Sequence, residues 1–331
     1  MAKNKNTIGL CCQHGRLAIA YRDNKGVMRS VWEDVPENMI NGHEIVSKNL
    51  FGELIKDTLA KNNIKAREVA YVISGEDVFV RNITIPRMEH QQILENIPFE
   101  FRDYISGELK EYLFDYAYIP PTDKDKADED KINVIAVATR RKEIEDVKEI
   151  MGHASLKLVK VAPDFCAFEK LLAQIPIPEE RMKERGFIDI GRNTTRLFIF
   201  KNGRYKLLHM VHVGGSRVIE TIADTMNVDL ELAKTYMYKD YENCTSLQEC
   251  MNVYKDISVE ILKGLNFYEM SDMSSRLGDV VLCGVGATLM PLCDLLKERI
   301  TMNVSTIGEI FTSLDHDKCL GISGTAVGII L

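Results

Sequence analysis

The stretch "FIDIGRNTTRLFIFKNGR", residues 187–204, decides the fold of this chain. Apolar residues lie on both sides of Asp189, Gly191 follows at once, and a second apolar run begins at Leu197. This pattern predicts two buried strands joined by a short turn. A carboxylate inside an apolar strand costs free energy unless a partner compensates its charge, so Asp189 needs an explanation.

The turn of this predicted hairpin has the composition of a phosphate site. Gly191 lets the backbone approach a ligand closely, and the amides and hydroxyls that follow, including those of Thr194 and Thr195, are donors for phosphate oxygens. An aspartate at the head of the hairpin can hold the water shell of Mg²⁺. The alternative is an aspartate that accepts hydrogen bonds from its own turn, and the motif by itself favours that alternative.

Two further glycine motifs lie between a predicted strand and a predicted helix. Gly214 and Gly215 precede a helix that begins near Ser216, where a helix N-terminus can meet phosphate. Gly284 and Gly286, in "LCGVGA", lie at a similar junction, where a nucleoside can lie flat against the backbone. Taken alone, each motif is also what a tight strand-to-helix loop requires.

The composition narrows the class of protein. The chain has 331 residues, of which 45% are hydrophobic and 27% charged, so two or more domains or subdomains are expected. A net charge of −7 with scattered Lys and Arg argues against nucleic acid as a partner. The polar N-terminus leads directly into a strand-like segment without an apolar signal region, which favours a cytoplasmic protein with no membrane insertion.

The eight cysteines are interpreted as reduced thiols. Cys11 and Cys12 are adjacent, and no C-x-x-C pair or His-rich spacing occurs, so we predict no metal site. A redox role for this adjacent pair is the weaker interpretation.

The pattern along the chain predicts an α/β protein with two similar halves. Each half begins with a strand–turn–strand hairpin, from Thr7 and from Phe187, and continues into strand–helix units. Between them, residues 86–157 predict a small α/β insertion that begins with a helix over residues 89–105. The closing segment "LGISGTAVGIIL" predicts a helix of small residues that packs closely on a sheet.

In this order, the motifs resemble those of the actin, Hsp70 and sugar-kinase superfamily, and within it the chain resembles the PilM family of type IV pilus assembly proteins. The entry to the family's inserted subdomain is matched by "RNITIPRM", residues 81–88, and its continuation by "FDYAYIP". The second half is similar at "FIDIG", "VGGSRVIETIA", "EILKGLNFYE" and "GTAVGIIL". The resemblance covers essentially the whole chain.

The resemblance implies an actin-like, ribonuclease H-like fold of duplicated domains with a small inserted α/β subdomain. We expect a first half over residues 1–85, an insertion over 86–157, a return to the first half over 158–185, and a second half over 186–331. The C-terminal helix is expected to pack back on the first half.

The resemblance also implies a nucleotide site between the two halves, with Mg-ATP as cofactor. Asp189 would belong to the second phosphate hairpin, and Asp164 would position the attacking water as a catalytic residue, although the superfamily usually has Glu or Gln there. The residues expected to bind nucleotide are Asp189, Gly191, Thr194, Thr195, Gly214, Gly215, Gly284, Gly286 and Ala287.

The first phosphate hairpin departs from the superfamily pattern. Cys11 stands where an aspartate is expected, Gln13 replaces a glycine, and His14 and Arg16 replace hydroxyl residues. A neutral thiol does not supply the anionic oxygen that hydrated Mg²⁺ needs. His14 and Arg16 have two interpretations, a cationic pair that replaces the metal or two surface residues at a hairpin tip, and the second is the simpler.

Three positions near the expected nucleoside also depart from the family pattern: Val285, Lys234 and Met237. Hydrolysis in this superfamily needs both hairpins to clamp the metal and the phosphates. We therefore predict that ATP hydrolysis is absent or negligible, while nucleotide binding stays open.

Two functions from different classes follow. The first is an assembly scaffold, at the inner face of the cell membrane, that binds the N-terminal tail of a PilN-like bitopic protein in a groove between the first half and the insertion, beside other inner-membrane assembly proteins of the pilus. The second is an enzyme, either an ATPase or a small-molecule kinase, which needs an intact first hairpin. A filament-forming actin is a third, weaker interpretation.

Overall fold

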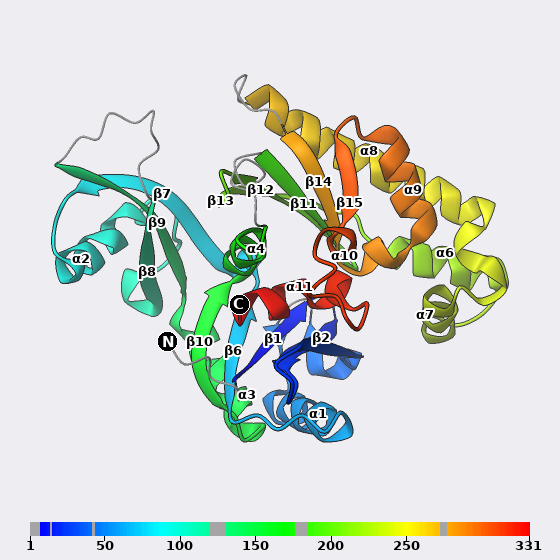
Figure 1. Cartoon of the computed structure of the whole chain (residues 1–331), viewed down its shortest axis with the longest axis horizontal. Coiled ribbons are helices and arrows are strands. Elements are labelled where there is room, and N and C mark those ends of the chain that lie inside the picture. The colour runs from blue at the N-terminus through cyan, green and yellow to red at the C-terminus, as the bar shows by residue number, and fades with distance from the viewer. Residues whose placement is uncertain (1–6, 14, 42–43, 120–129, 176–183, 272–276) are drawn as a thin grey trace.

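The computed structural model describes residues 7–13, 15–41, 44–119, 130–175, 184–271 and 277–331. Two five-stranded sheets form the two halves of the molecule (Figure 1). In each sheet three antiparallel strands are followed by two strands that continue parallel to the first. The predicted α/β class and the duplication of the hairpin are confirmed.

The first sheet has the strand order β10-β6-β1-β2-β3. Its strands are β1 (Thr7–Gln13), β2 (Arg16–Arg22), β3 (Met28–Asp34), β6 (Glu68–Ile73) and β10 (Lys157–Pro163). A short 3₁₀ helix η1 (Glu37–Met39) and the small ribbon of β4 (Ile40–Asn41) and β5 (Glu44–Ile45) follow β3. The second sheet, in the order β13-β12-β11-β14-β15, contains β11 (Glu184–Ile190), β12 (Thr195–Lys201), β13 (Arg204–Val211), β14 (Leu277–Cys283) and β15 (Asn303–Thr306).

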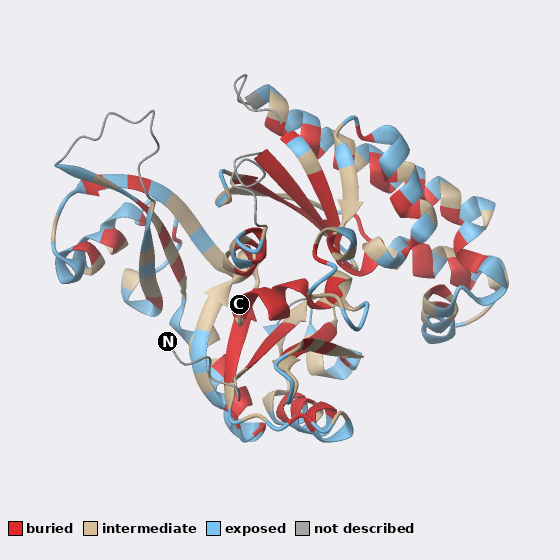
Figure 2. Ribbon diagram, viewed as in Figure 1, coloured by how far each residue is buried: buried red, intermediate tan, exposed pale blue. Residues whose placement is uncertain are grey.

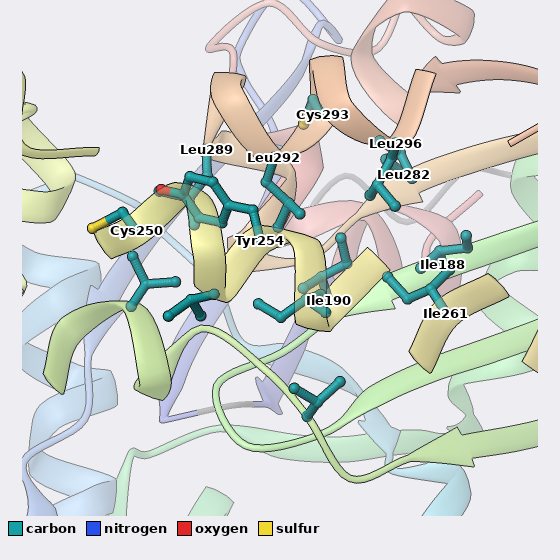
Figure 3. Close-up of a cluster of buried hydrophobic side chains, with 14 of the residues drawn as sticks. Ile188, Ile190, Cys250, Tyr254, Ile261, Leu282, Leu289, Leu292, Cys293 and Leu296 are labelled. Atoms are coloured by element: carbon teal, nitrogen blue, oxygen red, sulfur yellow. The ribbon is translucent and has the colours of Figure 1, made fainter. Parts of the chain in front are cut away.

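Helices cover the outer face of each sheet. Helices α1 (Lys48–Lys61) and α3 (Arg141–His153) pack on the first sheet. The second sheet is covered by α6 (Ser216–Met226), α7 (Leu230–Lys239), α8 (Gln248–Ser271) and α9 (Met290–Arg299), with the 3₁₀ helices η4 (Tyr241–Ser246) and η5 (Val285–Thr288) beside them. Figure 3 shows part of this outer core, where Ile188 and Ile190 of β11 meet Tyr254 of α8 and Leu292 of α9.

Two helices, α4 (Asp164–Leu172) and α11 (Leu320–Ile329), lie between the sheets (Figure 1). Gly9 of β1 lets α11 approach, because a Cβ at that position would lie 1.9 Å from the carbonyl oxygen of Ala326. Gly328 does the same toward α4, where a Cβ would lie 2.3 Å from the carbonyl oxygen of Ala167. The small residues of the C-terminal segment therefore form a closely packed helix, as predicted, and the short helix α10 (Ile307–Ile310) leads toward it.

The insertion has its own sheet, in the order β7-β9-β8. It contains β7 (Val78–Pro86), β8 (Tyr112–Ile119) and β9 (Lys131–Arg140), with the 3₁₀ helices η2 (Gly75–Asp77) and η3 (Leu109–Glu111), and α2 (His90–Glu100) covers one face. The sheet of the insertion begins at Val78, before residue 86. Helix α3, which lies within residues 86–157, contributes to the core of the first half. Helix α2 ends at Glu100 and not at residue 105 as predicted, and it contains Pro98 two residues before its end.

The central strands of the two large sheets, such as β2, β11 and β12, are buried at almost every position, because both of their faces are covered (Figure 2). Side chains of the two sheets that face each other form one central core with α4 and α11, and the outward faces form one core per half. Among the described residues, no helix is both long enough and apolar enough to cross a bilayer.

Candidate functional site

The alternation along β11 places Asp189 in the central layer. Ile188 and Ile190 face the outer core, while Phe187 faces the central core, so Asp189 shares the inward face with Phe187. Asp189 is 4% exposed. Its compensating partner is Arg196, which stands directly opposite it in the register of β11 and β12.

Arg196 joins two carboxylates that lie far apart in the sequence. Its Nη2 donates to Asp189 Oδ2, and its Nη1 donates to Asp164 Oδ2 at 2.8 Å and to Ser74 Oγ at 3.0 Å. Arg196 is 1% exposed and Asp164 is fully buried. The sequence interpretation missed Arg196, although it is part of the stretch that raised the question about Asp189.

Asp164 is the first residue of α4 and accepts three further hydrogen bonds. The backbone amides of Gly75 and Phe165 donate to its two oxygens at 3.0 and 2.8 Å, and Gln13 Nε2 lies 3.4 Å from Oδ2. The carboxylate therefore ties α4 to η2, to the first hairpin and to the second sheet, which is a structural use of the residue predicted to be catalytic.

Burial raises the pKa of the Asp164 carboxyl above its usual value, and the Arg196 guanidinium offsets part of this shift. Burial also works to lower the pKa of Arg196, but Asp189 and Asp164 raise it above its ordinary value. Two buried carboxylates thus share one guanidinium, and the cluster keeps an excess of negative charge.

The first hairpin brings Cys11 and Gln13 to this cluster. Cys11 is 1% exposed, and burial, with a smaller contribution from Asp189, raises the pKa of its thiol to about 11. Gln13 lines the cleft and bonds Thr325 as well as Asp164, both at 3.4 Å. His14 lies outside the described residues.

Two of the donors expected to hold phosphate in the second hairpin, the Gly191 amide and the Thr195 hydroxyl, are used within the protein. The Gly191 amide donates to the Thr194 carbonyl at 2.9 Å, and the Thr195 hydroxyl donates to the Val213 carbonyl at 2.8 Å. At the start of α6, the amides of Gly215 and Ser216 donate to the carbonyls of Gly191 and Arg192 at 2.9 and 2.8 Å. Thr194 lines the cleft.

The remaining glycines lie where backbone segments touch. A Cβ at Gly214 would lie 2.5 Å from the Arg192 carbonyl oxygen, and one at Gly284 would lie 2.3 Å from Asp189 Oδ1. Gly286 packs on the Ile190 side chain, and the Ala287 amide donates to the Gly284 carbonyl at 3.2 Å. These contacts alone account for the small residues of the two strand-to-helix loops.

A cleft of about 470 Å³ lies between the halves. Its lining residues come from both, namely Cys12, Gln13, Gly15, Glu37, Ile40, Asn41, Ser74 and Glu76 from the first and Arg192, Asn193, Thr194, Arg196, Ser216 and Glu220 from the second. Cations and carboxylates are mixed along its walls, so the cleft is not a purely basic anion funnel.

The nucleoside side of the cleft is almost filled. A recess of only about 10 Å³ remains among the expected nucleoside contacts Gly215, Lys234, Met237 and Val285. Arg16 is 3% exposed, so it is not a surface residue at a hairpin tip as the simpler interpretation had it.

The described residues contain no group of three or more His, Cys, Asp and Glu side chains arranged to hold a metal ion. Each of the eight cysteines is a free thiol.

The fold is shared with actin-like proteins. The chain matches a structure described as a PilM–PilN type IV pilus biogenesis complex with a TM-score of 0.80 and 20% identity, over 99% of this chain and 98% of the other. It also matches the ethanolamine utilization protein EutJ from Carboxydothermus hydrogenoformans (TM-score 0.61, 13% identity, 98% and 88% covered) and the archaeal actin homologue Ta0583 (TM-score 0.51, 10% identity, 98% of each chain). At these identities the matches show the fold.

A comparison with curated protein sequences found no match. The model of a protein family, described as type IV pilus assembly protein PilM, matches residues 19–320. With the actin-like architecture and the hairpin geometry, this match over most of the chain shows that the protein belongs to the PilM family of type IV pilus assembly proteins.

Proposed function

We propose that this protein is a non-hydrolysing scaffold of type IV pilus assembly that works in the cytoplasm, at the inner face of the cell membrane. It docks there by binding the N-terminal cytoplasmic tail of a PilN-like bitopic protein. Family membership and the structural match to a PilM–PilN complex support this proposal.

The proposal that the protein does not hydrolyse ATP rests on one observation, the position of Arg196. Mg²⁺ in this superfamily's site needs a carboxylate oxygen with several waters. Here the guanidinium of Arg196 lies between Asp189 and Asp164 and donates to both. The opposite hairpin offers the protonated thiol of Cys11. These residues do not fit a magnesium ion.

The lack of space on the nucleoside side of the cleft also argues against nucleotide binding. A recess of about 10 Å³ has room for about one water molecule, not for an adenine nucleoside. The amides of Gly191, Gly215 and Ser216 already donate to carbonyl oxygens, so binding phosphate there would require breaking protein hydrogen bonds.

An acidic recess supports the proposed binding of the partner tail. The recess lies beside the two segments that connect the first half to the insertion. Carboxylates of Glu44, Asp77, Glu143 and Asp146 surround it, and its walls are apolar side chains of β5, β6 and α3. Lys48 pairs with Asp146 at 2.6 Å and Lys142 with Glu44 at 4.0 Å, and Glu143 adds a further carboxylate to the recess. The recess measures about 40 Å³, so we assign it to the end of one basic side chain of the tail, since opposite charges favour and orient association.

Calorimetry on the purified protein tests both parts of the proposal. A peptide copy of the N-terminal tail of the PilN-like protein from the same organism should bind, while Mg-ATP should neither bind nor turn over. Glu143→Lys should weaken peptide binding several-fold, whereas Glu145→Lys, an exposed residue of α3 outside the recess, should not. ATP turnover above background would overturn the scaffold and support the ATPase alternative. Equal effects of the two Lys variants would overturn the assignment of the recess.

A further inference from the structure

The two halves touch across the mouth of the cleft through a segment that includes the end of β3 and η1. The guanidinium carbon of Arg16 lies 4.3 Å from the ring centroid of Trp32, in the same half. It also lies 4.4 Å from the ring centroid of Tyr238, on α7 of the second half. Arg16 is thus held between two aromatic rings of different halves, and a buried guanidinium gains more from such contacts than an exposed one.

Two ion pairs cross the cleft beside these rings. Lys234 Nζ of α7 lies 3.5 Å from Asp34 Oδ2. The other carboxylate oxygen of Asp34, Oδ1, lies 3.4 Å from Arg16 Nε. Arg192, in the turn of the second hairpin, donates from Nη2 to Glu37 Oε1 at 2.8 Å. The second half supplies Arg192 and Lys234, and the first half supplies both carboxylates.

These contacts surround the small recess on the expected nucleoside side, which is lined by Asp34, Lys234 and Tyr238. Arg192 borders both the cleft of about 470 Å³ and the small recess beside Lys234. Any opening of the mouth must break the pairing of Arg192 with Glu37 and of Lys234 with Asp34, and must draw Tyr238 away from Arg16. The buried Arg196–Asp164 pair secures the base of the same cleft.

We propose that the Arg16–Tyr238, Lys234–Asp34 and Arg192–Glu37 contacts form a cleft latch that holds the two halves closed without a nucleotide. The latch fixes the relative orientation of the halves by protein side chains alone. It goes beyond the scaffold function, because it requires neither a PilN-like tail nor any statement about ATP affinity.

The test measures closure in the full-length protein without nucleotide. Hydrogen–deuterium exchange reports on residues 32–41 and 230–239, and small-angle X-ray scattering reports the radius of gyration. Arg192→Glu turns an attractive pair into a repulsive one, and we expect exchange in both segments to rise about fivefold and the radius to increase. Adding Glu37→Arg restores the attraction and should return both quantities to the wild-type values.

The matched control is Arg217→Glu. Arg217 pairs with Asp256 at 3.1 Å within the second half, so the same change of charge should leave exchange in both segments unchanged. A neutral variant, Tyr238→Leu, keeps apolar volume but removes the ring over Arg16, and it should also raise exchange in both segments. Raising the salt to 1 M should loosen the wild-type protein in the same direction, because exposed pairs are screened.

The latch is refuted if Arg192→Glu behaves like Arg217→Glu, or if Glu37→Arg does not rescue it. It is also refuted if the wild-type protein becomes compact only after Mg-ATP is added. Binding of Mg-ATP to a protein that is already closed would instead count against the scaffold proposal and leave the latch standing, so the two failures are distinguishable.

Discussion

Arg196 stands directly opposite Asp189 across the second hairpin, and its guanidinium donates to the Asp189 carboxylate. Cross-strand partners of opposite charge stabilise a hairpin, but here both side chains face the central layer and are buried. The pair extends to Asp164 of α4, so one guanidinium connects the second sheet to the helix between the halves.

The first prediction concerns the loss of this guanidinium. Arg196→Met keeps most of the volume but leaves Asp189 and Asp164 buried without their cation, which should lower the free energy of unfolding by about 3–5 kcal/mol. Urea denaturation measures this loss. Arg204→Met is the control, since that side chain is 57% exposed and its pair with Glu169 spans 3.4 Å, and its effect should stay within about 0.5 kcal/mol. Similar losses for both variants would contradict the role of Arg196.

The second prediction is a pH dependence that Asp164 contributes. Its folded-state pKa is raised from 3.8 by burial, so the native state binds this proton more tightly than the unfolded state. The stability contributed by the protonated form is present at low pH and is lost as pH rises from 3.8 through the raised pKa. The stability of the wild type relative to Asp164→Asn should therefore fall as pH rises through that interval, measured by denaturation at several pH values. A constant difference would contradict the raised pKa.

The third prediction separates the glycines that are required from those that are not. Gly284 has φ +81°, and an added Cβ would lie 2.3 Å from Asp189 Oδ1, so Gly284→Ala should cost about 2–4 kcal/mol. At Gly321 of α11 an added Cβ meets nothing within 4 Å. Gly321→Ala should leave stability unchanged or raise it by up to about 1 kcal/mol, because Ala favours the helix. Thermal unfolding of the two variants compares them, and equal melting temperatures would contradict this account.

The sequence predicts much of this hairpin and part of its chemistry. The apolar runs before and after the turn, with Gly191 as turn residue, are enough to predict both buried strands. The sequence also contains the information that predicts Arg196. Ile190 and Thr195 flank the turn and pair with each other, so the next pair along the hairpin is Asp189 with Arg196. A charge in each of two apolar strands at that register indicates a buried pair.

Other features depend on contacts that local patterns do not contain. Arg16 and Tyr238 come from different halves, and the ring lies over the guanidinium because α7 contacts Trp32 and Asp34 of β3. The end of helix α2 is another example, since its apolar stripe continues to residue 105 while the helix ends at Glu100. Whether Mg-ATP binds stays a prediction.

The fourth prediction concerns an attempt to restore the first phosphate hairpin. Cys11→Asp with Gln13→Gly recreates the superfamily pattern, yet it adds a carboxylate near Asp189, which already shares Arg196 with Asp164. We expect no Mg-ATP affinity by calorimetry and a loss of about 2 kcal/mol or more in stability. Cys11→Ser with Gln13→Gly is the control and should be less destabilising. Micromolar Mg-ATP binding by the Asp variant would show that Arg196 does not block the site.

The last prediction is that the eight thiols are slow to react in the folded protein. Burial raises the pKa of Cys11 from 9.0 to about 11 and that of Cys12 to about 12. At pH 8 the thiolate fraction of Cys11 is therefore about a hundredfold lower than that of a thiol at its ordinary pKa, and the thiolate is the form that reacts. Iodoacetamide labelling followed by mass spectrometry should modify Cys319 first, since it is half-buried and burial raises the pKa of the other half-buried thiols, Cys12 and Cys166, to about 12. Cys11 should be modified only after unfolding in urea. Rapid labelling of Cys11 in the native protein would contradict a buried first hairpin, because both its pKa and its access to reagent depend on the packing of α11 against β1.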